Sequence, residues 1–367
     1  MIEKALAVHA GRVFQYFMQF EPRQVHAPEF GQQWLNSPPL SIRALRGRVV
    51  LIDFWDYTCV NCIHTLPYVK EWNRRYRDRG LTVIGVHAPE FFFARTAENV
   101  IQAAKEFQIE YPILLDNEYE VWKAFANRYW PAKYLIDKDG YMRYFHPGEG
   151  NYAETECMIQ QLVREIDPAV SLPPVMEPVR ALDKPEALTV CERPTPELYL
   201  GYKRGRITNP EGFTEDRIAN YQSGAQVAQD AIELSGPWFA DAQFAAVAAH
   251  PAGGEPSTLR LAYSAAEINL VMAPGTNPFP SRIQIADNIT ADITDNITGN
   301  GAALDHQSRG EDVREESDGS TWIEIDRPRM YSVVKRDRYV SRTLRLSSRS
   351  TGLQLFAFTF VSCVPRP

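Results

Sequence analysis

The chain has 367 residues, which at roughly 150 residues per domain suggests about two domains. It is 44% hydrophobic and 23% charged, an ordinary composition for a folded protein with enough apolar material for two cores. The formal net charge of −7 argues against a surface for nucleic acid or anionic membrane, so we expect neither partner. No run approaches the roughly 20 apolar residues of a membrane-spanning helix.

Residues 1–20 have apolar positions spaced as in an amphipathic helix. The segment lacks the basic start and long apolar centre of a signal peptide. We therefore expect an N-terminal helix and, for the chain as printed, a cytoplasmic location. An exported or membrane-fused full-length form stays open.

Residues 21–167 alternate between short apolar runs and amphipathic stretches. The apolar runs are typical of strands covered on both faces, and the amphipathic stretches of helices. The expected elements are strand 48–55, helix 60–77, strand 81–86, helix 96–107, a hairpin over 133–145 that turns at Asp139-Gly140, and helix 153–166. This order predicts an α/β domain with a mixed sheet and helices on both faces.

Residues 168–196 hold seven prolines, a density that predicts an extended linker. Beyond it, residues 197–367 carry short alternating runs separated by Gly, Pro, Asn, Asp and Ser clusters. This texture predicts an all-β sandwich of the jelly-roll kind.

The chain has five cysteines, too few for a disulfide scaffold. Cys157 lies in a helical pattern and is expected to be a small buried apolar residue. Cys191 and Cys363 fall near the edges of the second domain. A reducing cytosol disfavours a disulfide between them, and their pairing is left open.

Only Cys59 and Cys62 are close in sequence, at the predicted start of a helix after a buried strand. Cysteines three apart share a helix face, so their sulfurs can form and release a disulfide. The helix start favours the thiolate of Cys59, which predicts that Cys59 attacks and Cys62 resolves. A zinc site is the alternative, but it needs two further ligands, and His64 lies round the helix. We expect neither a metal nor a cofactor.

The surrounding residues resemble the thioredoxin superfamily. Asp53 matches the buried acid that exchanges a proton with the resolving cysteine, and Pro67 the proline that bends the active-site helix. Trp130-Pro131 matches the position of the cis-proline, which places substrate backbone beside the disulfide. The chain is similar to the TlpA/ResA-like branch, and within it to the soluble C-terminal part of DipZ-type proteins. The matching phrases are residues 27–30, 57–62, 85–91, 130–132, 148–150 and 195–202.

This resemblance implies a thiol–disulfide oxidoreductase that acts on protein thiols and disulfides, with a redox donor or acceptor protein. The catalytic residues would be Cys59, Cys62 and Asp53, and burial should raise the pKa of Asp53. The substrate-binding residues would be Thr58, His87, Trp130, Pro131 and Gly148. Thr58 departs from the Trp that the family commonly has before its nucleophile. His87 has loop capping as an equal alternative, and Gly148 a simple turn.

Two other functions are weighed. A thiol peroxidase would need Thr or Ser three residues before the attacking cysteine, where this chain has Asp56. Alternatively, the β-sandwich binds carbohydrate and the redox domain is auxiliary. The aromatic residues that could stack on sugars are Tyr199, Tyr202, Trp238 and Trp322. Buried core aromatics are the commoner explanation, so scaffolding or partner docking is favoured for this domain.

Overall fold

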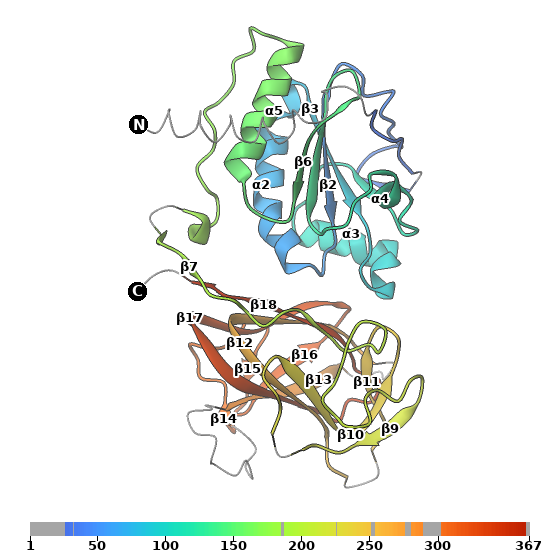
Figure 1. Cartoon of the computed structure of the whole chain (residues 1–367), viewed down its shortest axis with the longest axis vertical. Coiled ribbons are helices and arrows are strands. Elements are labelled where there is room, and N and C mark those ends of the chain that lie inside the picture. The colour runs from blue at the N-terminus through green and yellow to red at the C-terminus, as the bar shows by residue number, and fades with distance from the viewer. Residues whose placement is uncertain are drawn as a thin grey trace. The chain divides into compact units, whose positions relative to one another are not determined.

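The computed structural model describes residues 26–31, 33–184, 187–224, 226–250, 254–275, 280–288 and 302–364. The helix expected over residues 1–20 lies outside these ranges. The chain divides into two compact units between Lys184 and Pro185. The first unit is α/β and the second is built from strands (Figure 1).

The first unit contains a six-stranded mixed sheet with strand order β1-β4-β3-β2-β5-β6. Strands β2, β3 and β4 are parallel, whereas β1, β5 and β6 are antiparallel to their neighbours. The strands are β1 (Trp34–Leu35), β2 (Val49–Trp55), β3 (Leu81–His87), β4 (Ile113–Leu115), β5 (Ala132–Ile136) and β6 (Met142–Pro147).

The helices of this unit are α2 (Val60–Tyr76), α3 (Ala97–Glu106), α4 (Glu120–Ala124) and α5 (Tyr152–Ile166), with 3₁₀ turns η1 (Arg77–Arg79) and η2 (Phe92–Arg95). Helices α2 and α5 lie side by side and are joined by the stacked rings of Tyr68 and Tyr152 (Figure 1). The expected strands and helices are confirmed. The sequence missed β1, β4 and α4, which are too short to show a period.

Strand β2 is the centre of the sheet, and all seven of its residues are buried. Because side chains alternate along a strand, Val50, Ile52 and Phe54 enter one hydrophobic core. Asp53 therefore points to the opposite face, where it interacts electrostatically with Cys62 of α2. The apolar run thus places one carboxyl group under the active-site helix.

Residues 168–184, here called the strap, pack against the first unit. Their backbone carbonyls accept hydrogen bonds from α2, η1 and α5: Ser171 from Arg79, Pro173 from Gln160, and Pro174 from Arg75. The strap ends in the 3₁₀ turn η3 (Ala181–Asp183). The extended linker expected over 168–196 thus differs in its first part. Proline removes backbone donors but leaves carbonyl acceptors, and these anchor the segment.

The second unit is an antiparallel sheet of eleven strands. They are β8 (Leu198–Tyr199), β9 (Ile218–Tyr221), β10 (Ala231–Ala240), β11 (Ala245–Val247), β12 (Ser257–Ala273), β13 (Ser281–Asn288), β14 (Ala302–Ala303), β15 (Arg314–Glu315), β16 (Thr321–Ile325), β17 (Arg329–Ser348) and β18 (Gln354–Val361). The first half of β12 pairs with β10 and the second with β18, with a register shift after Ala265. A bulge of this kind bends a strand, and the sheet curves around one core. A thioredoxin-like α/β domain followed by a strand-rich domain is therefore confirmed.

The structure answers the pairing that the sequence left open and corrects one cysteine expectation. Cys191 and Cys363 form a disulfide between β7 (Val190–Cys191) and β19 (Cys363–Val364). The two residues are directly opposite in this antiparallel pair, which brings their Cα atoms to 4.1 Å. Cys157 is exposed rather than buried, because the buried side of α5 is centred on Glu156, Ile159 and Val163.

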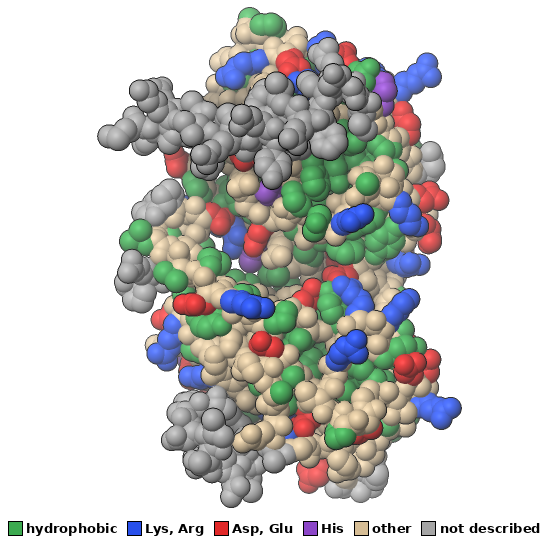
Figure 2. All heavy atoms as spheres, in the orientation of Figure 1, with side chains coloured by type: hydrophobic (Ala, Val, Ile, Leu, Met, Phe, Trp, Pro, Cys, Tyr) green, Lys and Arg blue, Asp and Glu red, His purple; other side chains and the backbone are tan. Residues whose placement is uncertain are grey.

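On the face drawn in Figure 2, acidic and basic side chains are interspersed. The described residues of this face thus form no broad field of one sign, of the kind that attracts nucleic acid. Within the described ranges, no helix combines the length and the apolar character needed to cross a bilayer.

Candidate active site

Cys59 and Cys62 lie where β2 gives way to α2. Cys59 is the N-cap of α2, with extended backbone, and its Sγ accepts a hydrogen bond from the Cys62 amide at 3.2 Å. The Cys59 amide donates to the carbonyl of Asp56, which closes the turn before the helix. Cys59 is partly exposed, Cys62 is buried, and both thiols are free. The outer cysteine is thus the accessible one, as the motif predicts.

Burial raises the pKa of the Cys59 thiol, and the hydrogen bonds from Cys62 lower it again. Burial raises the pKa of Cys62 further, and the neighbouring Cys59 adds to this rise. The hydrogen bonds at the helix start therefore favour the Cys59 thiolate but do not overcome the effect of burial on its pKa. Cys59 nonetheless stays the more acidic of the two.

Asp53 lies in the middle of β2 and is 1% exposed. It is opposite Gly85 of β3 on one side and Lys133 of β5 on the other. Burial raises its pKa to about 7, against the lowering effect of Lys133. The expected buried acid with a raised pKa is confirmed, and such a group gains and loses a proton near neutral pH.

Trp130, Pro131 and Gly148 meet at the start of β5. The Trp130–Pro131 peptide bond is cis, and the Pro131 carbonyl accepts a hydrogen bond from the Gly148 amide at 2.7 Å. The indole of Trp130 donates to the Ala88 carbonyl and packs on Trp122. Three of the five residues that the resemblance nominated for substrate contact are therefore neighbours.

Thr58 and His87 are buried rather than on the surface, and burial does not favour the contact with substrate expected for them. The Thr58 amide and hydroxyl both donate to one carboxylate oxygen of Asp56, and the Glu90 amide donates to the other. His87 is fully buried and stacks on Tyr57, and its Nε2 is 3.7 Å from Asp56 Oδ2. Burial lowers the pKa of His87 to about 3, so the ring is neutral. These residues hold the turn that leads to Cys59.

Sequence reasoning missed two charged residues of the site. Asp56 was considered only as an argument against a peroxidase, yet it accepts three hydrogen bonds beneath the turn. Lys133 was treated as an ordinary strand residue, yet it is fully buried. A lysine within a buried apolar strand is the signal that could have identified it, as an aspartate in the same setting identified Asp53.

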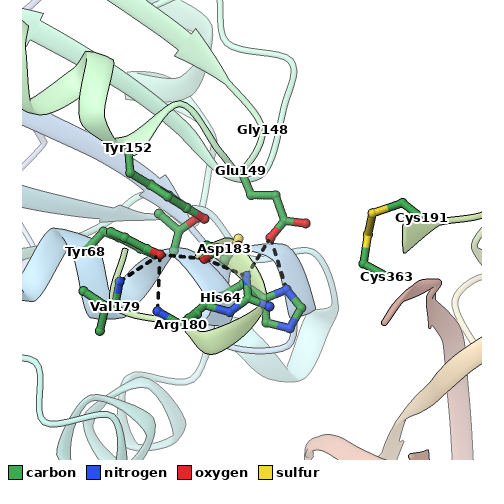
Figure 3. A network of polar contacts seen from close by, with 12 residues as sticks. His64, Tyr68, Gly148, Glu149, Tyr152, Val179, Arg180, Asp183, Cys191 and Cys363 are labelled. Carbon is green, nitrogen blue, oxygen red and sulfur yellow. Dashed lines mark hydrogen bonds and ion pairs between the residues drawn. A yellow bond between two sulfur atoms is a disulfide. The ribbon is translucent and has the colours of Figure 1, made fainter. Parts of the chain in front are cut away.

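A polar network joins the strap to α2 and to the loop after β6 (Figure 3). Tyr68 donates to Asp183 at 2.6 Å and accepts from the amides of Val179 and Arg180. Glu149, next to Gly148, pairs with His64 at 3.1 Å and with Arg180 at 3.6 Å. Arg180 of the strap therefore places a positive charge beside Glu149, in the loop that carries Gly148.

Two family models match separate parts of the chain. Residues 24–145 match the AhpC/TSA family, and residues 195–360 match the thioredoxin like C-terminal domain. The first match runs from before β1 into β6 and includes both redox cysteines, and the second spans most of the strand-rich unit.

Curated relatives cover different shares of the chain. DipZ of Mycobacterium tuberculosis is 34% identical over 332 residues, which are 89% of this chain and 41% of that protein. YkuV of Bacillus subtilis, a thiol-disulfide oxidoreductase, is 30% identical over 36% of this chain and 90% of its own length. ResA of Bacillus thuringiensis is 26% identical over 42% of this chain and 84% of its own length. The chain thus spans about two fifths of the DipZ relatives.

A Cys-x-x-Cys at the start of α2, a buried aspartate that interacts with it, and a cis-proline directly before β5 together define a redox protein of the thioredoxin class. The AhpC/TSA family match over residues 24–145 covers the part of the chain that holds this site. The chain belongs to the TlpA/ResA-like thiol–disulfide oxidoreductases of the thioredoxin superfamily.

Proposed function

We propose that this chain exchanges disulfides with protein substrates, with Cys59 as nucleophile, Cys62 as resolving thiol and Asp53 as proton carrier. The observation that carries the proposal is the cysteine pair at the start of α2, with an accessible Cys59, a buried Cys62 and a buried carboxyl close beneath. An outer thiol can attack a partner, and an inner thiol can act only once the partner is attached.

The reaction has two steps. The Cys59 thiolate attacks one sulfur of a substrate disulfide, the substrate S–S bond breaks, and the second substrate sulfur leaves as a thiolate. Asp53 then takes the proton of Cys62, whose thiolate attacks Cys59 Sγ and releases the remaining substrate sulfur. Two electrons pass to the substrate, and the reverse sequence oxidises a substrate dithiol. The direction follows from the relative stability of the thiolate and disulfide forms.

Trp130, Pro131 and Gly148 would contact the substrate backbone at this site. Pro131 has no amide hydrogen, and its carbonyl accepts a hydrogen bond from the Gly148 amide, so the backbone just before β5 is held in place. The alternative function of a thiol peroxidase is disfavoured by Asp56, whose carboxylate already accepts three hydrogen bonds. Measuring peroxide turnover with a dithiol donor separates the two.

For the strand-rich unit we propose partner docking rather than carbohydrate binding. Of the four candidate aromatics, Trp238 is 1% exposed and belongs to the core. Arg204 lies over the ring of Tyr199, Arg282 lies near the ring of Trp322, and the Tyr202 hydroxyl donates to Asp216. These aromatic faces and hydroxyls therefore already have neighbours. A glycan array on the whole chain tests the alternative, and specific sugar binding would favour it.

The cellular location is part of the same proposal. A disulfide between Cys191 and Cys363 is typical of proteins in oxidising compartments. This favours an exported or membrane-fused form over the cytoplasmic location expected from the sequence. Fractionation of the native host, followed by thiol labelling of Cys191 and Cys363, tests both points.

The exchange activity is tested by trapping. Cys62→Ser keeps the nucleophile but removes the resolving thiol, so mixed disulfides through Cys59 should accumulate in lysate and dissolve with dithiothreitol. The matched control is Cys62→Ser/Cys59→Ser, which should trap nothing. If the two variants behave identically, protein disulfide exchange is not the activity.

A further inference from the structure

Lys133 is the one fully buried lysine among the described residues, and it lies at the redox site. It lies on β5, two residues after Pro131, and is directly opposite Asp53 in the antiparallel β2–β5 pair. Residues directly opposite across such a pair point to the same face of the sheet. The sheet therefore places a lysine and a carboxyl group together beneath α2.

The Lys133 ammonium group lies close to the loop after β6 and to the start of α5. Its Nζ donates a hydrogen bond to the Gly148 carbonyl at 3.1 Å and lies 6.0 Å from the centre of the Tyr152 ring. The charged and titratable groups around it come from β2, α2, β6 with its following loop, and α5. They are Asp53, Cys59, Cys62, His146, Glu149 and Tyr152.

No cation approaches Asp53 from the other neighbouring strand within the described part of the chain. The residue opposite on β3 is Gly85, where an added Cβ would lie 2.9 Å from Trp55 Nε1 and 3.1 Å from Tyr111 Cε2. A longer side chain therefore does not fit there. The positive charge that acts on Asp53 comes from Lys133.

We propose that Lys133 is an electrostatic positioning residue for disulfide exchange, and that its buried ammonium group favours the ionised forms of Cys59, Cys62 and Asp53. This proposal rests on the exchange chemistry proposed above. Each step of that chemistry creates a negative charge away from water, on a thiolate or on the Asp53 carboxylate. A fixed cation in such a place acts more strongly than it would in water and needs no reorganisation.

Burial lowers the pKa of Lys133 overall, while several neighbouring groups favour its charged form. These groups are Asp53, Cys62, Glu149 and Cys59, each of which raises the pKa again. His146 adds no competing positive charge, because burial and Lys133 both lower its pKa. The Gly148 carbonyl and the Tyr152 ring are both favourable neighbours for an ammonium group.

The test compares Lys133→Met with Lys133→Gln in the full chain. Met removes the charge and the hydrogen bond, whereas Gln removes the charge and keeps an amide donor for the Gly148 loop. The readout is the rate of Cys59 alkylation by iodoacetamide across pH. In both variants the midpoint should rise by about one pH unit, which slows alkylation about tenfold below the midpoint. The plateau at high pH should not change.

A merely structural role would give another pattern. If Lys133 only anchors the loop, Met should alter the plateau through access to Cys59, Gln should restore it, and neither should move the midpoint. That result overturns the proposal. Tyr134→Phe is the matched control, because Tyr134 is the next residue of β5 and enters the opposite core. It should keep the wild-type profile.

A measurement on the wild-type chain covers the case in which the variants fold poorly. Nitrogen NMR of labelled lysine should give Lys133 a higher pKa in the dithiol form than in the disulfide form, because thiolates stabilise the ammonium group. Equal values overturn the proposal. The same samples show whether Cys59 and Cys62 cycle with glutathione. If they do not, the proposed exchange fails, whereas cycling with an unresponsive Lys133 refutes only its role.

Discussion

Asp53 and Asp56 are two buried carboxyl groups three residues apart, and they have opposite surroundings. Asp56 accepts hydrogen bonds from the Thr58 amide, the Thr58 hydroxyl and the Glu90 amide. Asp53 Oδ1 has no hydrogen-bond partner among the described residues. Burial raises the pKa of both, but at Asp56 these donors counteract it.

This contrast separates a structural carboxylate from one that can carry a proton. Donors aimed at a carboxylate fix its ionised form and its orientation. A buried carboxyl group without such donors is costly when ionised, so its pKa moves toward the working pH. Proximity to Cys59 in sequence would favour Asp56 as the catalytic acid, whereas the hydrogen bonds favour Asp53.

The largest effect is expected for Asp53→Asn. Without the base, resolution of a Cys59 mixed disulfide at pH 7 should slow about a hundredfold. Asp53 binds its proton more tightly in the folded chain (pKa about 7) than at its ordinary value of 3.8, so its contribution to wild-type stability should fall as pH rises from 4 to 7. The variant should regain about 4 kcal/mol at neutral pH. Stopped-flow kinetics measures the rate of resolution, and urea unfolding measures the stability. An unchanged rate of resolution would contradict the role of Asp53 as proton carrier.

Asp56→Asn should have the opposite effects: a loss of stability and no change in the pH dependence of resolution. The asparagine amide group would face an amide or hydroxyl donor that now binds the carboxylate, so the folded state should lose about 3 kcal/mol. Resolution should keep its midpoint near pH 7, because Asp53 is untouched. Urea unfolding and the pH–rate profile check this, and a lost midpoint would make Asp56 the proton carrier instead.

His87→Phe tests the neutral partner of Asp56. The folded pKa of His87 is about 3 and the ordinary value is 6.5, so only the unfolded chain takes up this proton in between. The contribution of His87 to wild-type stability should fall by about 1.4 kcal/mol per pH unit below pH 6.5, opposite in sign to that of Asp53, and the variant should lack this contribution. Unfolding at pH 5.5 and pH 7.5 measures it. An equal acid sensitivity in both proteins would mean that His87 is not buried neutral.

Tyr68→Phe should have the smallest effect. It removes the hydroxyl that binds Asp183 and the strap amides, which should cost about 1 kcal/mol and make the strap more open to protease. Because this hydroxyl is held by partners, as Asp56 is, resolution kinetics should not change. Limited proteolysis with mass spectrometry locates the cuts, and a change in the resolution midpoint would show that the strap acts on the redox centre.

The sequence was informative where one local rule decides the structure. The apolar run with a single aspartate gave β2 and the burial of Asp53, and the Cys-x-x-Cys gave the start of α2. It failed where several segments meet. Thr58 looked available because it flanks the motif and His87 because it ends a strand, but only the structure shows that both lie against Asp56.

The strap and the disulfide were missed for a related reason. Proline density correctly indicated a segment without long helices or strands, but it carries no information about where the free carbonyls bind. Cys191 and Cys363 are 172 residues apart, and only the pairing of β7 with β19 brings them together. Likewise, the role of Lys133 can be recognised only once the sheet places this residue opposite Asp53.

The most direct test of the contrast is a carbon NMR titration of the two carboxyl groups in the reduced wild-type chain. Labelled aspartate, assigned through Asp53→Asn and Asp56→Asn, resolves the two signals. We expect Asp53 to titrate with a midpoint of about 7 and to shift with the state of Cys62. A midpoint at the ordinary value near 3.8 would contradict the account, because Asp53 would then be ionised throughout the working range and could not serve as proton carrier.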